Sequence, residues 1–83
     1  MDKKEIEVKV KEVISLNSRY SIEEINPSDP LDKFITSFMA DRLARELKRK
    51  FDKIETTKMT NDLYSILKKV SDVIDRINSI YNK

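Results

Sequence analysis

The chain of 83 residues contains no cysteine, no histidine and no glycine. Without cysteine it has no disulfide, no thiolate nucleophile and no thiolate ligand for zinc or an iron–sulfur cluster. Without histidine it lacks the commonest metal ligand and the base of the serine and cysteine hydrolase triads. Without glycine, neither the P-loop nor the Rossmann phosphate-binding motif can be formed. We therefore predict no metal site and no enzymatic activity.

Long apolar runs are also missing, since the longest is the triple Phe38-Met39-Ala40 and a membrane-spanning helix needs about 20 such residues. The first ten residues, MDKKEIEVKV, contain no apolar signal region. We therefore expect a cytoplasmic protein with no membrane span.

The net charge of +2, from 17 basic and 15 acidic residues, is too balanced to indicate nucleic-acid binding by itself. The length predicts one domain, residues 1–83, with a modest core.

Three segments carry apolar residues at helical spacing: residues 3–16, 37–50 and 60–81. In the first segment the stripe is Ile6, Val10, Val13 and Ile14, and Val8 lies outside it. In the second it is Met39, Leu43, Leu47 and, just beyond the helix, Phe51. In the third it is Leu63, Ile66, Leu67, Val70, Val73, Ile74, Ile77 and Ile80. We expect most of these side chains to form the core, with Thr60 as the N-cap of the third helix.

The segment 17–34 is rich in turn formers and contains both prolines of the chain. The spacing of Ser21 and Glu24 matches a capping box and predicts a short helical turn. Another short turn is expected to open at Thr56-Thr57. The side chains expected to anchor the long loop to the core are Ile22, Ile25, Leu31 and Phe34. The sequence thus predicts an all-α bundle of three main helices plus one or two short turns, without a strand.

Ser37 stands at the first turn of the second predicted helix, directly after the long loop. The unpaired amide groups and the dipole of a helix N-terminus favour a phosphate at such a position, bound or esterified to the serine. A first-turn serine of this kind is also commonly no more than a helix cap. We expect the Thr36 hydroxyl to cap the helix, and Phe38 either to close over the core or to stand beside a group attached to Ser37.

Residues 4–74 resemble the superfamily of acyl carrier proteins and peptidyl carrier proteins. The run Ser37-Phe38-Met39-Ala40, continued by Leu43, Leu47 and Phe51-Asp52, is similar to the family's Ser-Leu-Met-Ala-x-x-Leu helix and its terminal Phe-Asp pair. The sequence of this run is most similar to that of carriers in polyketide-type assembly lines. The resemblance implies a small acyl-carrier-like bundle in which Ser37 carries 4′-phosphopantetheine, with Thr36 and Phe38 completing the attachment site.

The function implied by the resemblance is that of a freestanding acyl or aminoacyl carrier. Such a carrier holds intermediates as thioesters in polyketide, fatty-acid-like or related secondary metabolism. The implied partners are a phosphopantetheinyl transferase and acyl-loading and acyl-processing enzymes. Thr36 replaces the aspartate of the family signature, and the signature glycine is missing. The alternative is therefore a degenerate carrier or helical adaptor that binds a protein partner without a prosthetic group.

The second predicted helix is basic, whereas most members of the family have an acidic one. Residues 37–53 contain six basic and three acidic side chains. Arg42, Arg45 and Arg49 share one helical face, which predicts a docking surface for partners with acidic faces. The run Lys48-Arg49-Lys50 also complements the helix dipole. Nucleic-acid binding by this helix is a further alternative, but the function we expect involves no nucleic-acid partner. We expect the protein to be a monomer.

Overall fold

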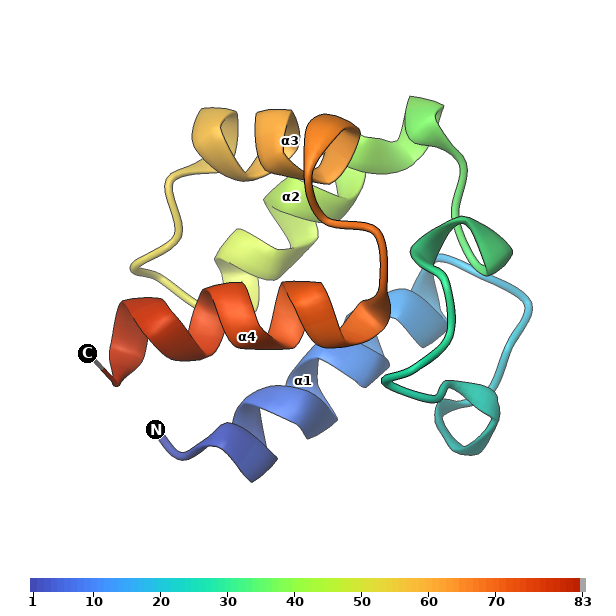
Figure 1. The fold of residues 1–83 in the computed structure, drawn as a ribbon, viewed down its shortest axis with the longest axis horizontal. Coiled ribbons are helices and arrows are strands. Elements are labelled where there is room, and N and C mark those ends of the chain that lie inside the picture. The colour runs from blue at the N-terminus through green and yellow to red at the C-terminus, as the bar shows by residue number, and fades with distance from the viewer. Residues whose placement is uncertain (83) are drawn as a thin grey trace.

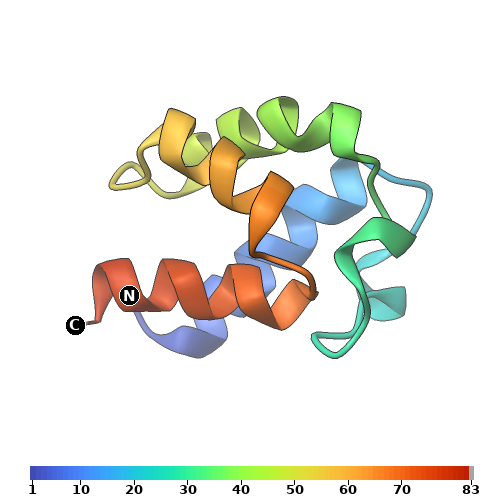
Figure 2. The same ribbon diagram turned by 45° about the horizontal axis from the view of Figure 1, so that its top comes forward.

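The computed structural model describes residues 1–82, which contain four α-helices and no strand. The helices are α1 (Lys3–Leu16), α2 (Ala40–Lys50), α3 (Thr56–Ser65) and α4 (Val70–Tyr81). Three 3₁₀ turns precede α2: η1 (Ile22–Glu24), η2 (Leu31–Lys33) and η3 (Ser37–Met39). Figures 1 and 2 show α1 crossing beneath α4, with α2 and α3 packed together on the other side. The expected all-α class is confirmed, but with one more helix and more short turns than predicted.

Helix α1 has the bounds that its periodicity predicts. It begins where a side-chain oxygen of Asp2 accepts a hydrogen bond from the Glu5 amide at 2.8 Å, which satisfies one of the free donors of the first turn. Its expected stripe is buried, and Val8 is exposed as predicted. The helix therefore contributes one apolar face to the core and a charged face to the solvent.

Helix α2 also ends where expected, at Lys50, but it begins at Ala40 and not at residue 37. The three preceding residues form the tighter turn η3. Leu43, Leu47 and Phe51 are buried, as are Ala40 and Ala44. Met39, which was predicted to be core, is only half-buried and packs against the core edge.

The predicted third helix over residues 60–81 is wrong, because the chain breaks it into α3 and α4. Helix α3 begins at Thr56, where the sequence predicted only a short turn. Its cap is Glu55, whose carboxylate accepts hydrogen bonds from the amides of Thr57 and Lys58, each at 3.1 Å. Thr60, the predicted cap, lies inside the helix and donates its hydroxyl to the Thr56 carbonyl at 2.9 Å.

The break between α3 and α4 is held by the long loop that precedes α2. Three backbone hydrogen bonds join the two segments: Leu31 N to Lys68 O at 2.8 Å, Val70 N to Asp29 O at 3.1 Å, and Ser71 N to Pro27 O at 2.8 Å. A straight helix would use the amides of Val70 and Ser71 internally. Because the loop supplies their acceptors instead, the chain turns at residues 66–69. Ile66, predicted to be core, is consequently 53% exposed.

Asp72 stabilises this corner from within α4. Its Oδ2 accepts hydrogen bonds from the amides of Lys69 at 2.9 Å and Lys68 at 3.0 Å. These bonds, the one from Lys69 foremost, lower the pKa of Asp72 below its ordinary value of 3.8. A carboxyl with a lowered folded-state pKa stabilises the fold above its ordinary pKa, and this contribution is lost as the pH falls through the folded-state pKa.

We expect Asp72→Ala to lower the free energy of unfolding by about 1 kcal/mol at neutral pH, the usual cost of a lost helix cap. Urea unfolding followed by circular dichroism measures the difference. The matched control is Asp75→Ala on the same helix, which removes only an exposed ion pair with Lys3 and is expected to cost less. The difference in unfolding free energy between wild type and Asp72→Ala should narrow as the pH falls below the ordinary carboxyl pKa and through the lowered folded-state pKa of Asp72. Equal costs for both variants would contradict this role of Asp72.

The long loop is anchored as predicted at three of its four expected positions. Ile25, Leu31 and Phe34 are buried, whereas Ile22 is exposed. The predicted turn after Ser21 is η1, and the Ser21 amide donates to the Glu24 carboxylate at 3.0 Å.

Within residues 1–82, none of the helices combines the length and the apolar character needed to cross a bilayer.

Candidate functional site

The candidate site lies where the long loop enters α2. Thr36 is extended, with φ −94° and ψ 164°, and its carbonyl accepts a hydrogen bond from the Met39 amide at 3.0 Å. This bond closes the turn η3, from which the chain continues into α2. The Thr36 side chain makes no capping hydrogen bond, so the expectation that its hydroxyl caps the helix is wrong. The turn is held by backbone bonds alone.

Ser37 is the first residue of η3, and its side chain is exposed. Among residues 1–82, no hydrogen bond within the protein involves its hydroxyl. The hydroxyl lies near the N-terminal end of α2, where the helix dipole places partial positive charge. Ser37 therefore presents an accessible oxygen, free of internal bonds, in a position that favours negative charge.

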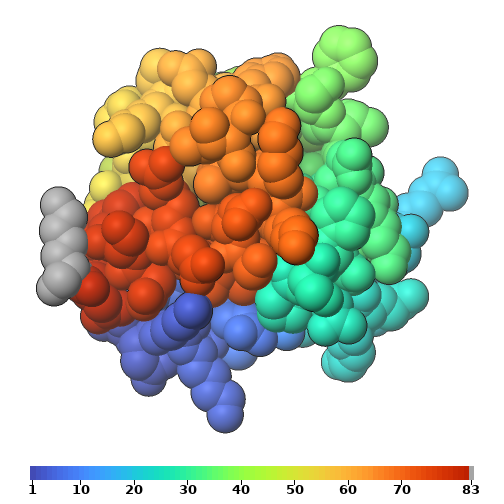
Figure 3. Space-filling model, in the orientation of Figure 1, coloured from blue at the N-terminus to red at the C-terminus, as the bar shows by residue number. Residues whose placement is uncertain are grey.

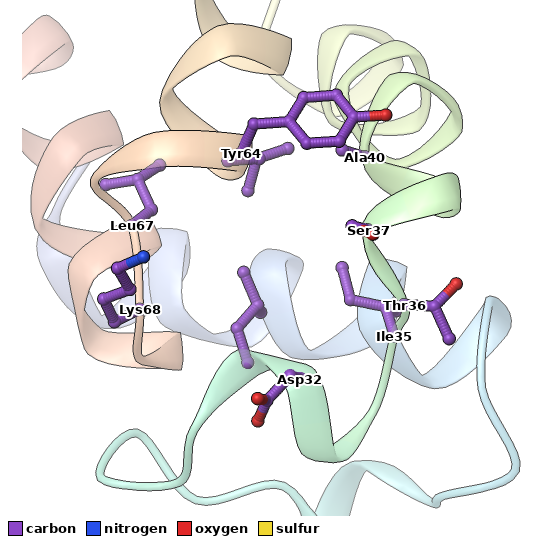
Figure 4. Close-up of a pocket in the computed structure, with 10 residues that line it drawn as sticks. Asp32, Ile35, Thr36, Ser37, Ala40, Tyr64, Leu67 and Lys68 are labelled. Atoms are coloured by element: carbon purple, nitrogen blue, oxygen red, sulfur yellow. The ribbon is translucent and has the colours of Figure 1, made fainter.

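A cleft of about 190 Å³ opens beside Ser37. One wall comes from the loop and the start of α2, and the other from the end of α3 and the corner before α4 (Figure 4). The lining residues are Leu31, Asp32, Ile35, Thr36, Ser37, Ala40, Leu63, Tyr64, Leu67 and Lys68. In Figure 4, Tyr64 reaches from α3 toward Ala40, while Ser37 and Ile35 face Leu67 and Lys68 across the opening.

The cleft is apolar at its base and polar at its mouth. Leu31, Ile35 and Leu67 are largely buried, whereas Asp32 and Lys68 are exposed. A narrow, mostly aliphatic group attached to Ser37 can therefore lie against the base while its polar atoms remain near water. Asp32, Tyr64 and Lys68 were not predicted to be site residues, and nothing in their spacing indicates it. Tyr64 and Lys68 reach the site only because the tertiary hydrogen bonds described above bring the end of α3 to the loop that carries Asp32.

Phe38 points away from the cleft. Its side chain is 92% exposed, and it is not among the residues that line the opening beside Ser37. The expected position over the core is therefore wrong, while a place beside a group attached to Ser37 stays a prediction. In the space-filling view, the segment around residues 37–40 projects from the upper right of the molecule (Figure 3).

The three predicted docking arginines are all exposed on α2. Two of them form ion pairs within the helix: Arg45 Nη2 lies 2.6 Å from Asp41 Oδ2, and Arg49 Nη1 lies 3.7 Å from Glu46 Oε1. Arg42 forms no ion pair with any residue in the described range. The arginines thus share a solvent-facing surface, and of the three only Arg42 forms no ion pair with residues 1–82.

Comparison of the chain with protein-family models, with curated proteins and with solved structures finds no match in any of the three. Within residues 1–82, no group of three or more carboxylates is arranged to hold a metal ion. The junction at Ser37 and the surface of α2 are therefore the features from which a function can be inferred.

Proposed function

We propose that the protein is a freestanding acyl or aminoacyl carrier that bears 4′-phosphopantetheine on Ser37. It would serve polyketide, fatty-acid-like or related secondary metabolism. The observation that carries this proposal is the exposed serine, with a hydroxyl free of internal hydrogen bonds, at the entrance to α2 and at the edge of a cleft with an apolar base. The resemblance of residues 37–52 to the attachment helix of carrier proteins supports it.

The chain's own residues fit the attached group in three ways. Ser37 offers the oxygen for a phosphodiester, and its exposure leaves room for a transferase to reach it. The N-terminal end of α2 stabilises the phosphate charge. Leu31, Ile35 and Leu67 provide an apolar surface for the aliphatic part of the group. When attached, phosphopantetheine supplies the terminal thiol that carries the acyl group as a thioester, which a chain without cysteine cannot supply itself.

The proposed partners are a phosphopantetheinyl transferase and the enzymes that load and process the acyl group. Because Arg42, Arg45 and Arg49 are exposed on α2, these enzymes are expected to present acidic docking faces. Association should accordingly weaken as salt is added. Enzymes that recognise an acidic carrier helix are expected to bind this chain poorly.

Co-expression with a broad-specificity phosphopantetheinyl transferase tests the carrier function. We expect the intact mass to increase by one phosphopantetheine, because the Ser37 hydroxyl is exposed and unengaged. A folded protein that stays unmodified with that enzyme, and also with coenzyme A and the transferase of its own source, would contradict the proposal. Circular dichroism of the same sample confirms that the helices are present.

The second candidate is a degenerate carrier or helical adaptor that binds a protein and never carries the group. One observation favours it: Thr36 replaces the signature aspartate and makes no side-chain cap, so the residue directly before Ser37 offers a transferase no carboxylate. An adaptor would use the exposed surface of α2 without needing Ser37. Persistent lack of modification, together with binding of a protein partner, would support this candidate.

A further inference from the structure

A second cleft, of about 170 Å³, lies between α3, α4 and the segment that joins α2 to α3. None of its lining residues also lines the cleft beside Ser37. In Figures 1 and 2, the joining segment (yellow) and the turn η3 (green) lie at opposite ends of the molecule. The second cleft is therefore separate from the candidate attachment site.

Contacts between its three walls hold the second cleft in shape. The Tyr81 hydroxyl of α4 donates to Asp52 Oδ1 at 3.0 Å and accepts a hydrogen bond from the Lys53 amide at 3.3 Å. This attaches the joining segment to α4. Arg76 Nη2 lies 3.3 Å from Asp62 Oδ2 and so links α4 to α3. A ligand that enters a cleft already held in this way loses little binding free energy to ordering the protein.

The base of the second cleft is apolar. Ile54 and Met59 line it and are buried, and Ile80 lines it while packing half-buried against the core. A cavity of about 150 Å³ with apolar walls holds one benzene molecule. The second cleft thus has both the volume and the apolar surface for one ring-sized body.

The basic residues of the second cleft outnumber the acidic ones. They are Lys53, Lys58 and Arg76, against Glu55 and Asp62. Glu55 is engaged as the cap of α3, and Asp62 is paired with Arg76. Neither lysine forms an ion pair within residues 1–82. Two lysines are therefore available to an anion, and the guanidinium, with five N–H donors, retains donors that its one ion pair does not use.

We propose that the second cleft binds a small monocarboxylate whose apolar body is about the size of one aromatic ring. The body lies against the apolar base, as in other small-molecule sites. The carboxylate accepts charge-assisted hydrogen bonds from the basic residues at the rim.

The charge of the ligand follows from the two carboxylates that also line the second cleft. Glu55 and Asp62 repel a second negative charge at short range, so a monoanion is favoured over a phosphate dianion. An uncharged ring lacks the attraction to the lysines. The proposal does not depend on modification of Ser37, because the two clefts share no lining residue.

Benzoate is the probe for this site, titrated at constant ionic strength and neutral pH into ¹⁵N-labelled, unmodified full-length protein. We expect amide shift changes centred on residues 53–62 and 76–80, with a dissociation constant of about 1–10 mM for a ligand of this size. The double variant Lys53→Gln/Lys58→Gln should weaken binding by about tenfold, because it removes both available ammonium groups. Ile80→Phe should weaken it by at least about tenfold, because the larger side chain fills the apolar base.

The matched control is Lys4→Gln/Lys50→Gln, which removes the same charge from two exposed lysines outside the second cleft. It should leave the affinity within about twofold, since screening weakens distant charges. The amide spectrum of each variant verifies its fold.

Three further ligands separate the contributions of charge and body. Benzamide has the ring without the charge, acetate has the charge without the ring, and phenyl phosphate is largely a dianion at neutral pH. Each should bind at least about fivefold more weakly than benzoate. Equal binding of any of them, an equal loss in the lysine control, shift changes centred on the cleft beside Ser37, or no shift change with benzoate up to about 30 mM would each overturn the proposal.

Discussion

Phe51→Ala is expected to lower the free energy of unfolding by about 3–5 kcal/mol, the usual cost of removing a buried phenyl ring. Phe51 is fully buried directly after α2, where its amide donates to the Leu47 carbonyl at 2.8 Å. Its ring lies 6.0 Å from that of Tyr81 in α4. Alanine would leave a cavity between these elements. Since a domain has only about 5–15 kcal/mol in total, a large share of the stability should be lost.

Urea unfolding followed by circular dichroism measures this loss, and Phe38→Ala provides the matched control. The same side chain is removed there from a position that is 92% exposed, so we expect a change of about 0.5 kcal/mol or less. If Phe51→Ala does not fold, Phe51→Leu keeps part of the packing and should cost about 1–2 kcal/mol. Similar costs at positions 38 and 51 would contradict the packing described here.

Ser37→Ala is expected to abolish attachment of phosphopantetheine and to leave the fold unchanged. The attached group needs the hydroxyl oxygen, and alanine has none. The fold does not need it, because the side chain is exposed and forms no hydrogen bond within the described residues. Intact mass after incubation with coenzyme A and a transferase measures attachment, and a urea titration measures stability.

The matched control for Ser37→Ala is Ser79→Ala, which removes an exposed hydroxyl from α4. This variant should be modified to the same extent as the wild type. Modification of Ser37→Ala would show that the group is attached elsewhere and that the alignment with carrier proteins is out of register. Unfolding of Ser37→Ala at a much lower urea concentration would assign a structural role to the serine.

Helix periodicity predicts the elements of this chain where local pattern and tertiary packing agree. Ile6, Val10 and Val13 recur at helical spacing and are buried, and Val8 is off the stripe and exposed. Leu43, Leu47 and Phe51 behave in the same way in and after α2. Each of these helices buries one face, so the spacing of its apolar residues is enough to predict the helix and its buried side.

The break between α3 and α4 could not be predicted from that pattern. Leu63, Leu67 and Val70 follow helical spacing across residues 60–70, and no proline or glycine marks an end. The helix ends because loop carbonyls at Pro27 and Asp29 accept the amides that would otherwise bond within it. These partners are distant in the sequence, so propensity cannot reveal them.

Only part of the candidate site could be predicted, because the rest of it is formed by residues that are distant in the sequence. Ser37 was identified because a helix start is a local feature, and the structure brings a cleft to its side. The opposite wall, with Tyr64 and Lys68, depends on the corner after α3. The direction of Phe38 depends on the 3₁₀ turn at Ser37–Met39, which rotates successive side chains further than an α-helix does.

The most direct test of the carrier function is to purify the protein from its own source and map modifications by fragment-ion mass spectrometry. We predict phosphopantetheine on Ser37 in at least part of the population, and on no other residue. Ser37 found unmodified in every such preparation, and still unmodified after treatment with coenzyme A and the source's own transferase, would contradict the carrier function.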